Sequence, residues 1–181
     1  GLGLSGGNLE RDLSVLDNLT AQYKIENTQI KGWLKTSNIQ KNWLHRKFSS
    51  LDLDKYQDPK VAVLGLAYKE NTNSIRNSSA IHFLNQIREY NVYVHDPVVK
   101  LFNISWLRQV DNSTEALKNA DVLIIATPWP EYQNLKLKTL HSLMKRPIII
   151  DPSSLLSNQN PSKYGFKWIR LGTTKNSESE P

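Results

Sequence analysis

The chain has 181 residues, 39% of them hydrophobic, which is enough apolar material for one folded domain, and no apolar run approaches the roughly 18–20 residues of a membrane span. The net charge is +6, but the basic residues are spread along the chain, which favours a solvated surface or a small phosphate-bearing ligand over nucleic acid. The absence of cysteine excludes a disulfide scaffold, a thiolate zinc site and a cysteine nucleophile.

Residues 8–48 carry a helical pattern and no strand signal. Two helices are predicted, over residues 12–24 and 26–45. The second has an apolar side made of Ile30, Trp33, Leu34, Ile39, Trp43 and Leu44. Its tryptophans suggest burial against a partner, although packing within the same chain explains them equally well. Residues 49–59 are polar, contain a proline and are predicted to be a linker.

From residue 60 onward, strands and helices alternate. Helices are predicted over residues 78–90 and 113–119, with Ser78 and Ser113 as N-caps. Nearly all-apolar strands in such an order are typical of a doubly wound parallel sheet with both faces covered. The predicted fold class is therefore α/β, a Rossmann-like sheet in three layers preceded by a helical segment. Four strands and a possible fifth are predicted at residues 61–66, 91–95, 121–126, 148–150 and 166–169.

Polar residues follow the predicted strands, where ligands of such sheets bind. Tyr68 and Lys69 follow the first strand, Asp96 the second, Thr127 the third and Asp151 the fourth. Ordinary turn chemistry suffices to explain Asp96 and Thr127, because each precedes a proline. Lys69 is the stronger candidate for ligand binding, since Asn or Ser would end a strand better.

The N-terminal glycines formally match a dinucleotide-binding pattern, G-x-G-x-x-G, at Gly1, Gly3 and Gly6. That fingerprint requires a strand before it, and none precedes Gly1. The first predicted strand is followed by a single glycine, Gly65. We therefore expect no dinucleotide-phosphate loop in this chain, and we expect the chain to be part of a longer one. The same residues do not form a signal peptide.

Five segments in order match one family. Residues 1–12 follow the pattern G-x-G-F-G-G-S-C-F-P-K-D, and residues 61–78 follow V-A-V-L-G-L-A-F-K-x-x-T-D-D-x-R-x-S. Residues 95–97 resemble Y-D-P, and residues 120–132 resemble A-D-A-L-V-I-A-T-x-W-x-E-F. Residues 150–154 stand where the family has D-G-R-N. The chain thus resembles the UDP-glucose/GDP-mannose dehydrogenases, which are nucleotide-sugar 6-dehydrogenases.

The resemblance implies a division of the chain. Residues 1–50 would be a helical dimerisation segment of the central domain, and residues 60–172 the C-terminal domain that binds the nucleotide sugar. Residues 173–181 are expected to be a disordered tail, and the N-terminal NAD-binding domain to be missing. The family uses NAD to oxidise a sugar alcohol to a carboxylate through a cysteine thioester, in polysaccharide biosynthesis. A cytoplasmic homodimer is implied, with no metal, membrane or nucleic acid.

The resemblance also assigns site residues. Asp12 would be catalytic, although a helix N-terminal acid explains it nearly as well. Arg76 and Arg11, which stands where the family has a lysine, would contact the cofactor. The nucleotide-sugar substrate would be bound by Leu4, Gly6, Tyr68 and Lys69.

Several residues depart from the family pattern. Asn8 stands at the position of the catalytic cysteine, and an amide can form no thioester. Glu10 replaces a proline, Asn73 and Ser74 replace two acids, and Ser153 replaces an arginine that contacts the substrate. Two hypotheses follow: the C-terminal part of a diverged dehydrogenase, or a non-catalytic paralogue that still binds nucleotide sugars. An unrelated flavodoxin-like regulatory domain is the third.

Overall fold

The computed structural model describes residues 2–102 and 104–173, so Gly1 and almost all of the predicted tail lie outside the described residues. Its centre is a parallel six-stranded sheet with the strand order β3-β2-β1-β4-β5-β6. The chain runs outward from β1 to β3 and then crosses back to β4, as in a doubly wound Rossmann sheet. The strands are β1 (Lys60–Leu64), β2 (Asn91–His95), β3 (Leu107–Gln109), β4 (Val122–Ile125), β5 (Ile148–Ile150) and β6 (Lys167–Ile169).

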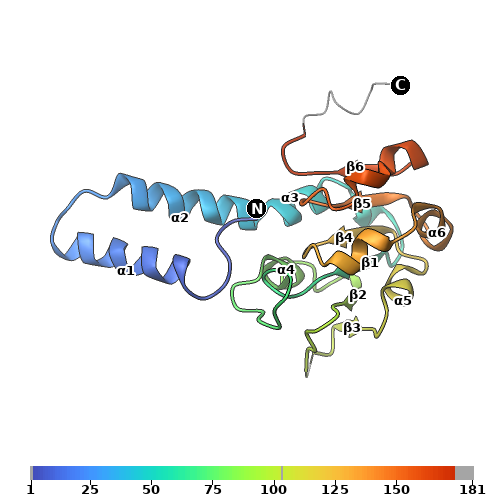
Figure 1. Cartoon of the computed structure of the whole chain (residues 1–181), viewed down its shortest axis with the longest axis horizontal. Helices are drawn as coiled ribbons and strands as arrows, with labels where there is room; N and C mark the ends of the chain where they lie inside the picture. The colour runs from blue at the N-terminus through green and yellow to red at the C-terminus, as the bar shows by residue number, and fades with distance from the viewer. Residues whose placement is uncertain (1, 103, 174–181) are drawn as a thin grey trace.

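In the described residues six α-helices accompany the sheet, and α1 and α2 form an antiparallel hairpin that projects from it (Figure 1). The helix α3 packs on β5, and α5 packs on β1 and β2. Four short 3-10 helices connect the later elements: η1 (Leu53–Lys55), η2 (Pro130–Asn134), η3 (Ser157–Gln159) and η4 (Pro161–Tyr164). The α-helices are α1 (Leu9–Gln22), α2 (Thr28–Lys41), α3 (Trp43–Ser49), α4 (Ser79–Leu84), α5 (Ser113–Leu117) and α6 (Leu137–Leu143).

The central strands form the core because nearly every side chain on them is apolar. All four residues of β4 and the last four of β1 are buried. A strand can be apolar on both of its sides only where the sheet is covered on both faces. The predicted α/β class, with a parallel sheet between helices, is therefore confirmed.

The helical boundaries differ from the prediction. The helix predicted over residues 26–45 is interrupted at Asn42, where α2 ends and α3 begins. Trp43 is buried in the core of the same chain, whereas Trp33 is 59% exposed. The predicted helix over residues 78–90 ends at Leu84, and Ser78 caps it as expected by accepting hydrogen bonds from two backbone N–H groups.

Three other predictions were wrong or incomplete. The N-cap of α5 is Asn112 rather than Ser113, since the Asn112 side chain accepts the Glu115 N–H at 2.9 Å. The predicted linker over residues 49–59 packs on the core through Leu51 and Leu53, both of which are buried. The sequence analysis missed β3 and α6 altogether.

Within residues 2–102 and 104–173, no helix has the length and apolar character that a membrane crossing requires.

Candidate functional site

A cavity of about 460 Å³ lies at the carboxyl ends of β1, β4 and β5. This is the edge of the sheet where the winding direction reverses and where such folds bind ligands. The N-terminal loop, residues 2–8, and the first turn of α4 close it on the other side. The cavity is lined from these segments by Leu2, Gly3, Ser5, Tyr68, Lys69, Glu70, Ser79, Ala126, Pro128, Pro152 and Ser153.

The polar residues that directly end β2, β4 and β5 are engaged inside the fold. Thr127 donates its hydroxyl to the Ala67 carbonyl at 2.6 Å. The Asp151 carboxylate accepts the backbone N–H groups of residues 155 and 156 at 3.0 and 3.1 Å. The Asp96 carboxylate, 2% exposed, accepts five N–H donors. These three residues therefore shape the edge of the sheet.

The turn after β1 is not built to hold a dinucleotide phosphate. In a dinucleotide-binding turn, backbone N–H groups at the start of the following helix point at the ligand. Here the N–H groups of Leu66 and Ala67 are both taken by Asp96 Oδ2, at 2.6 and 3.2 Å. The helix that follows, α4, has only six residues. The described residues therefore do not fit the pyrophosphate of NAD at this turn.

Tyr68 and Lys69 lie together in the cavity. The Lys69 ammonium is 5.7 Å from the centroid of the Tyr68 ring, within the range of a cation–π contact. No ion pair within 4.0 Å among the described residues includes Lys69. The ring of Tyr68 abuts Gly6, where a Cβ would lie 3.0 Å from the Tyr68 Cε2 atom. The arrangement offers a flat aromatic surface and a charge without a protein partner.

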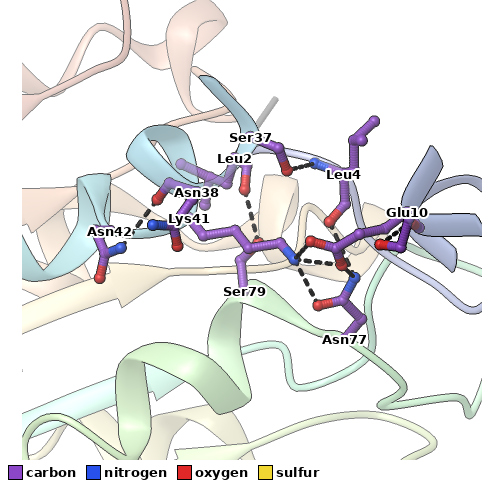
Figure 2. Close-up of polar contacts among 10 residues, drawn as sticks. Leu2, Leu4, Glu10, Ser37, Asn38, Lys41, Asn42, Asn77 and Ser79 are labelled. Atoms are coloured by element: carbon purple, nitrogen blue, oxygen red, sulfur yellow. Dashed lines mark hydrogen bonds and ion pairs between the residues drawn. The ribbon is translucent and has the colours of Figure 1, made fainter. Parts of the chain in front are cut away.

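The N-terminal loop is fastened to both neighbouring parts of the chain (Figure 2). The Leu2 carbonyl accepts the Ser79 hydroxyl at 3.0 Å, which ties the loop to α4. The Leu4 N–H donates to Ser37 Oγ at 2.9 Å, which ties it to α2. Gly3 has φ +87°, and a Cβ there would lie 2.6 Å from the Ser37 carbonyl oxygen. Only glycine allows so close an approach to α2.

A polar cluster of Glu10, Lys41 and Asn77 completes this attachment (Figure 2). The Lys41 ammonium is 2.6 Å from both Glu10 carboxylate oxygens and 2.7 Å from Asn77 Oδ1, and Lys41 is only 8% exposed. The Asn77 amide donates to Glu10 and to the Leu4 carbonyl. Neither Lys41 nor Asn77 is predicted from the sequence. The one signal for this cluster was Glu10, an acid at a position where the family pattern has a proline.

We expect Lys41→Met to loosen the N-terminal loop. The methionine keeps most of the side-chain volume but leaves the Glu10 carboxylate with one partner fewer in a partly buried position, at a cost of about 2 kcal/mol. Backbone amides of residues 4–8 should then exchange with solvent roughly tenfold faster, measured by hydrogen–deuterium exchange. Lys35→Met, an exposed change on the same helix, is the control. Unchanged exchange in Lys41→Met would contradict the fastening role.

The other predicted site residues do not line this cavity. Asn8, Arg11 and Asp12 are exposed at the start of α1, and none of them lines it. Arg11 donates from Nε and Nη2 to Asp12 Oδ1, at 3.0 and 2.9 Å. Arg76 lies against the loop: its carbonyl accepts the Gly6 N–H at 3.2 Å.

Leu4, which was predicted to bind the substrate, does not line the cavity at the carboxyl ends of the strands. It lines a second cavity, of about 460 Å³, between α1 and α2. The roles assigned to these residues by resemblance stay predictions.

Two buried side chains, His95 and Tyr132, contact each other at the carboxyl end of β2. Tyr132 donates its hydroxyl to the His95 carbonyl at 3.1 Å. Burial, reinforced by the nearby charges of Asp96 and Glu131, raises the pKa of Tyr132 far above its usual range, so the hydroxyl keeps its proton. His95 Nδ1, 3.0 Å from the same hydroxyl oxygen, is then the donor of that contact. This pair holds the end of β2 in place.

The family model that matches this chain is the UDP-glucose/GDP-mannose dehydrogenase family, UDP binding domain, over residues 62–158. The chain is similar to the UDP-glucose 6-dehydrogenase of Rickettsia prowazekii (strain Madrid E), with 29% identity over 180 residues, 96% of this chain and 42% of the relative. It is similar to the enzyme of that name from Rhizobium meliloti (strain 1021), with 33% identity over 120 residues, 62% of this chain and 27% of the relative.

Solved structures of nucleotide-sugar dehydrogenases are also similar to this chain. The UDP-D-ManNAc dehydrogenase from Pyrococcus horikoshii has a TM-score of 0.78 at 26% identity, over 95% of this chain and 39% of that chain. The NDP-N-acetyl-D-galactosaminuronic acid dehydrogenase from Methanosarcina mazei Go1 has a TM-score of 0.81 over 100% of this chain and 41% of that chain, but at 19% identity it supports the fold alone. The chain spans about two fifths of the length of the Rickettsia relative and of these structures.

Proposed function

The chain belongs to the UDP-glucose/GDP-mannose dehydrogenase family, and we propose that it binds the nucleoside-diphosphate end of a nucleotide sugar in the cavity at the carboxyl ends of β1, β4 and β5. The main support is Lys69, which lines that cavity and has no ion-pair partner within 4.0 Å among the described residues. It also lies within the residues that the family model matches.

The cavity offers each part of a nucleotide a suitable contact. The Lys69 ammonium pairs with a phosphate oxygen in a charge-assisted hydrogen bond. The Tyr68 ring, held against Gly6, gives the base an aromatic surface. The glycine-rich loop brings its backbone to the cavity at Gly3, which lines it and adopts a φ of +87° that other residues avoid.

Oxidation of the sugar is a proposal for the protein to which this chain belongs. The resemblance assigns NAD as cofactor, Arg76 and Arg11 as its contacts and Asp12 as the catalytic carboxylate that helps to position or activate water. The turn after β1 does not fit a dinucleotide phosphate, as described above, so the role proposed for the cavity of this chain is to bind the nucleotide sugar. A cytoplasmic location and a role in polysaccharide biosynthesis remain expectations of the resemblance.

The second candidate is a non-catalytic paralogue that keeps the nucleotide-sugar site. Asn8 favours it, because this residue stands where the family has its cysteine and the sequence contains no cysteine at all. No residue of this chain can therefore form the covalent thioester. The two candidates differ in one observable: whether the protein, isolated as it occurs in its source cell, forms NADH from NAD and UDP-glucose.

We expect Lys69→Ala to weaken the binding of UDP-glucose by about 10–100-fold. One hydrogen bond to a charged group contributes about 1.5–3 kcal/mol, and each 1.4 kcal/mol is tenfold in affinity. Isothermal titration calorimetry on the 181-residue chain measures the change. Lys138→Ala, which removes an exposed lysine of α6 far along the chain, is the matched control. Equal affinities in the two variants would contradict the proposed role of Lys69.

We also propose that the α1–α2 hairpin forms a homodimer interface. It exposes the large apolar side chains of Leu16, Leu19 and Trp33 by 45%, 46% and 59%, and large apolar side chains exposed on one hairpin favour an interaction surface. The chain should therefore sediment as a dimer at tens of micromolar, and Trp33→Glu should shift it towards monomer. Lys35→Glu, on the same helix, should not. A wild-type chain that sediments as a clean monomer would contradict the interface.

A further inference from the structure

Glu70 is the single acidic residue among those that line the cavity. It directly follows Lys69 and is half-buried. No ion pair within 4.0 Å in the described parts of the chain includes it. A half-buried carboxylate without a cationic partner is available to a ligand as a hydrogen-bond acceptor. It also repels any negative charge that is brought close to it.

The formal charges of the residues that line the cavity cancel, and the uncharged side chain of Ser153 contributes to this balance. Lys69 contributes +1 and Glu70 contributes −1, and the other lining residues carry no formal charge. Ser153, at the end of β5, stands where the family pattern has an arginine, so this wall of the cavity lacks a positive charge that the resemblance leads one to expect. A ligand with a phosphate on one side and neutral hydroxyl donors on the other suits this arrangement.

Nucleotide sugars and free nucleoside diphosphates differ in the charge of the second phosphate and in the hydroxyl groups next to it. In a nucleotide sugar the second phosphate is esterified to the sugar, so the ionisation with a pKa near 6 that a terminal phosphate undergoes is absent. A free diphosphate therefore brings more negative charge than its sugar ester at neutral pH. It also lacks the second sugar, whose hydroxyls can donate hydrogen bonds to a carboxylate.

We propose that Glu70 is a specificity-determining residue, whose carboxylate accepts hydrogen bonds from sugar hydroxyls and repels a terminal phosphate. The cavity thereby prefers a nucleotide sugar to the free nucleoside diphosphate. This inference rests on the proposed function, because it presupposes that Lys69 holds a phosphate in the same cavity. Lys69 and Glu70 line the same cavity, so a ligand whose phosphate contacts the first has its neighbouring groups within the cavity that the second also lines.

The test compares dissociation constants for two ligand pairs, UDP-glucose with UDP and GDP-mannose with GDP, by isothermal titration calorimetry. In the wild-type chain we expect the sugar ester of at least one pair to bind about tenfold more tightly than its free diphosphate. A like-charge contact in a partly solvated site has an effect of this order. In Glu70→Gln the free diphosphate should gain about tenfold, so that the ratio falls towards one.

Two further variants complete the experiment. Glu89→Gln, which removes an exposed carboxylate elsewhere, should leave the ratio unchanged. Ser153→Arg should tighten the free diphosphate more than the sugar ester. If the wild-type chain binds neither pair, the proposed function itself is contradicted. If it binds a pair and Glu70→Gln leaves the ratio unchanged, the role assigned to Glu70 is overturned while the nucleotide site stands.

Discussion

Gly65→Ala is expected to destabilise the fold by about 3 kcal/mol or more, because two separate costs coincide. Gly65 ends β1 with φ +91°, a conformation that an alanine adopts only with strain. A Cβ at this position would also lie 2.4 Å from Thr127 Cβ, 2.6 Å from Thr127 N and 2.8 Å from Thr127 Cα. Two of these atoms are backbone at the end of β4, so no side-chain rotation relieves the contact.

Urea denaturation of the variant and the wild type measures this loss. Gly32→Ala is the matched control, since a Cβ at Gly32 meets nothing within 4 Å and the residue lies inside α2. Alanine there should stabilise the protein by about 0.5–1 kcal/mol. A Gly65→Ala chain as stable as the wild type would show that β1 and β4 do not approach each other as described.

Asp96→Asn should cost about 3–5 kcal/mol, although the side chains are nearly identical in shape. One carboxylate oxygen accepts the N–H groups of Val98 and Val99, and the other accepts those of Leu66, Ala67 and the Trp129 indole. An amide replaces one acceptor by a donor. Whichever way it is turned, its NH₂ group faces at least two N–H donors that have lost their partner, and at least one of them is buried.

Thermal and urea unfolding, with Asp111→Asn as control, test this expectation. The Asp111 side chain is 94% exposed and pairs only with an exposed lysine, so its replacement should leave stability unchanged within error. If Asp96→Asn is as stable as the wild type, the carboxylate does not organise the turns after β1, β2 and β4. The shape of the cavity would then need another explanation.

The sheet was predictable from the sequence because its strands are short, apolar and separated by turn residues. The exception is β3, which contributes only Leu107–Gln109 at the edge of the sheet. Two of its three residues are polar, so no apolar run in the sequence indicates a strand there. The break between α2 and α3 at Asn42 was missed for a similar reason: no proline stands there, and the apolar pattern continues through it.

The site was predictable in part. Tyr68 and Lys69 follow a strand, and strand ends converge at one edge of a parallel sheet, so both line the cavity. The cluster of Glu10, Lys41 and Asn77 was not predictable, because its members are 31, 36 and 67 residues apart. No local pattern relates residues at such separations. They come together only because α1, α2 and the loop before α4 meet around the N-terminal loop (Figure 2).

The most direct test of the account is a crystal structure of this chain with UDP-glucose. We expect the diphosphate within hydrogen-bond distance of Lys69 Nζ, the base against the Tyr68 ring, and the sugar hydroxyls towards Glu70. A polar cavity of about 710 Å³ lies at the opposite end of the strands, at their amino ends. It is lined by Lys60, Arg108 and Lys118 among others. A nucleotide bound there, with the cavity at the carboxyl ends of β1, β4 and β5 empty, would contradict the central claim.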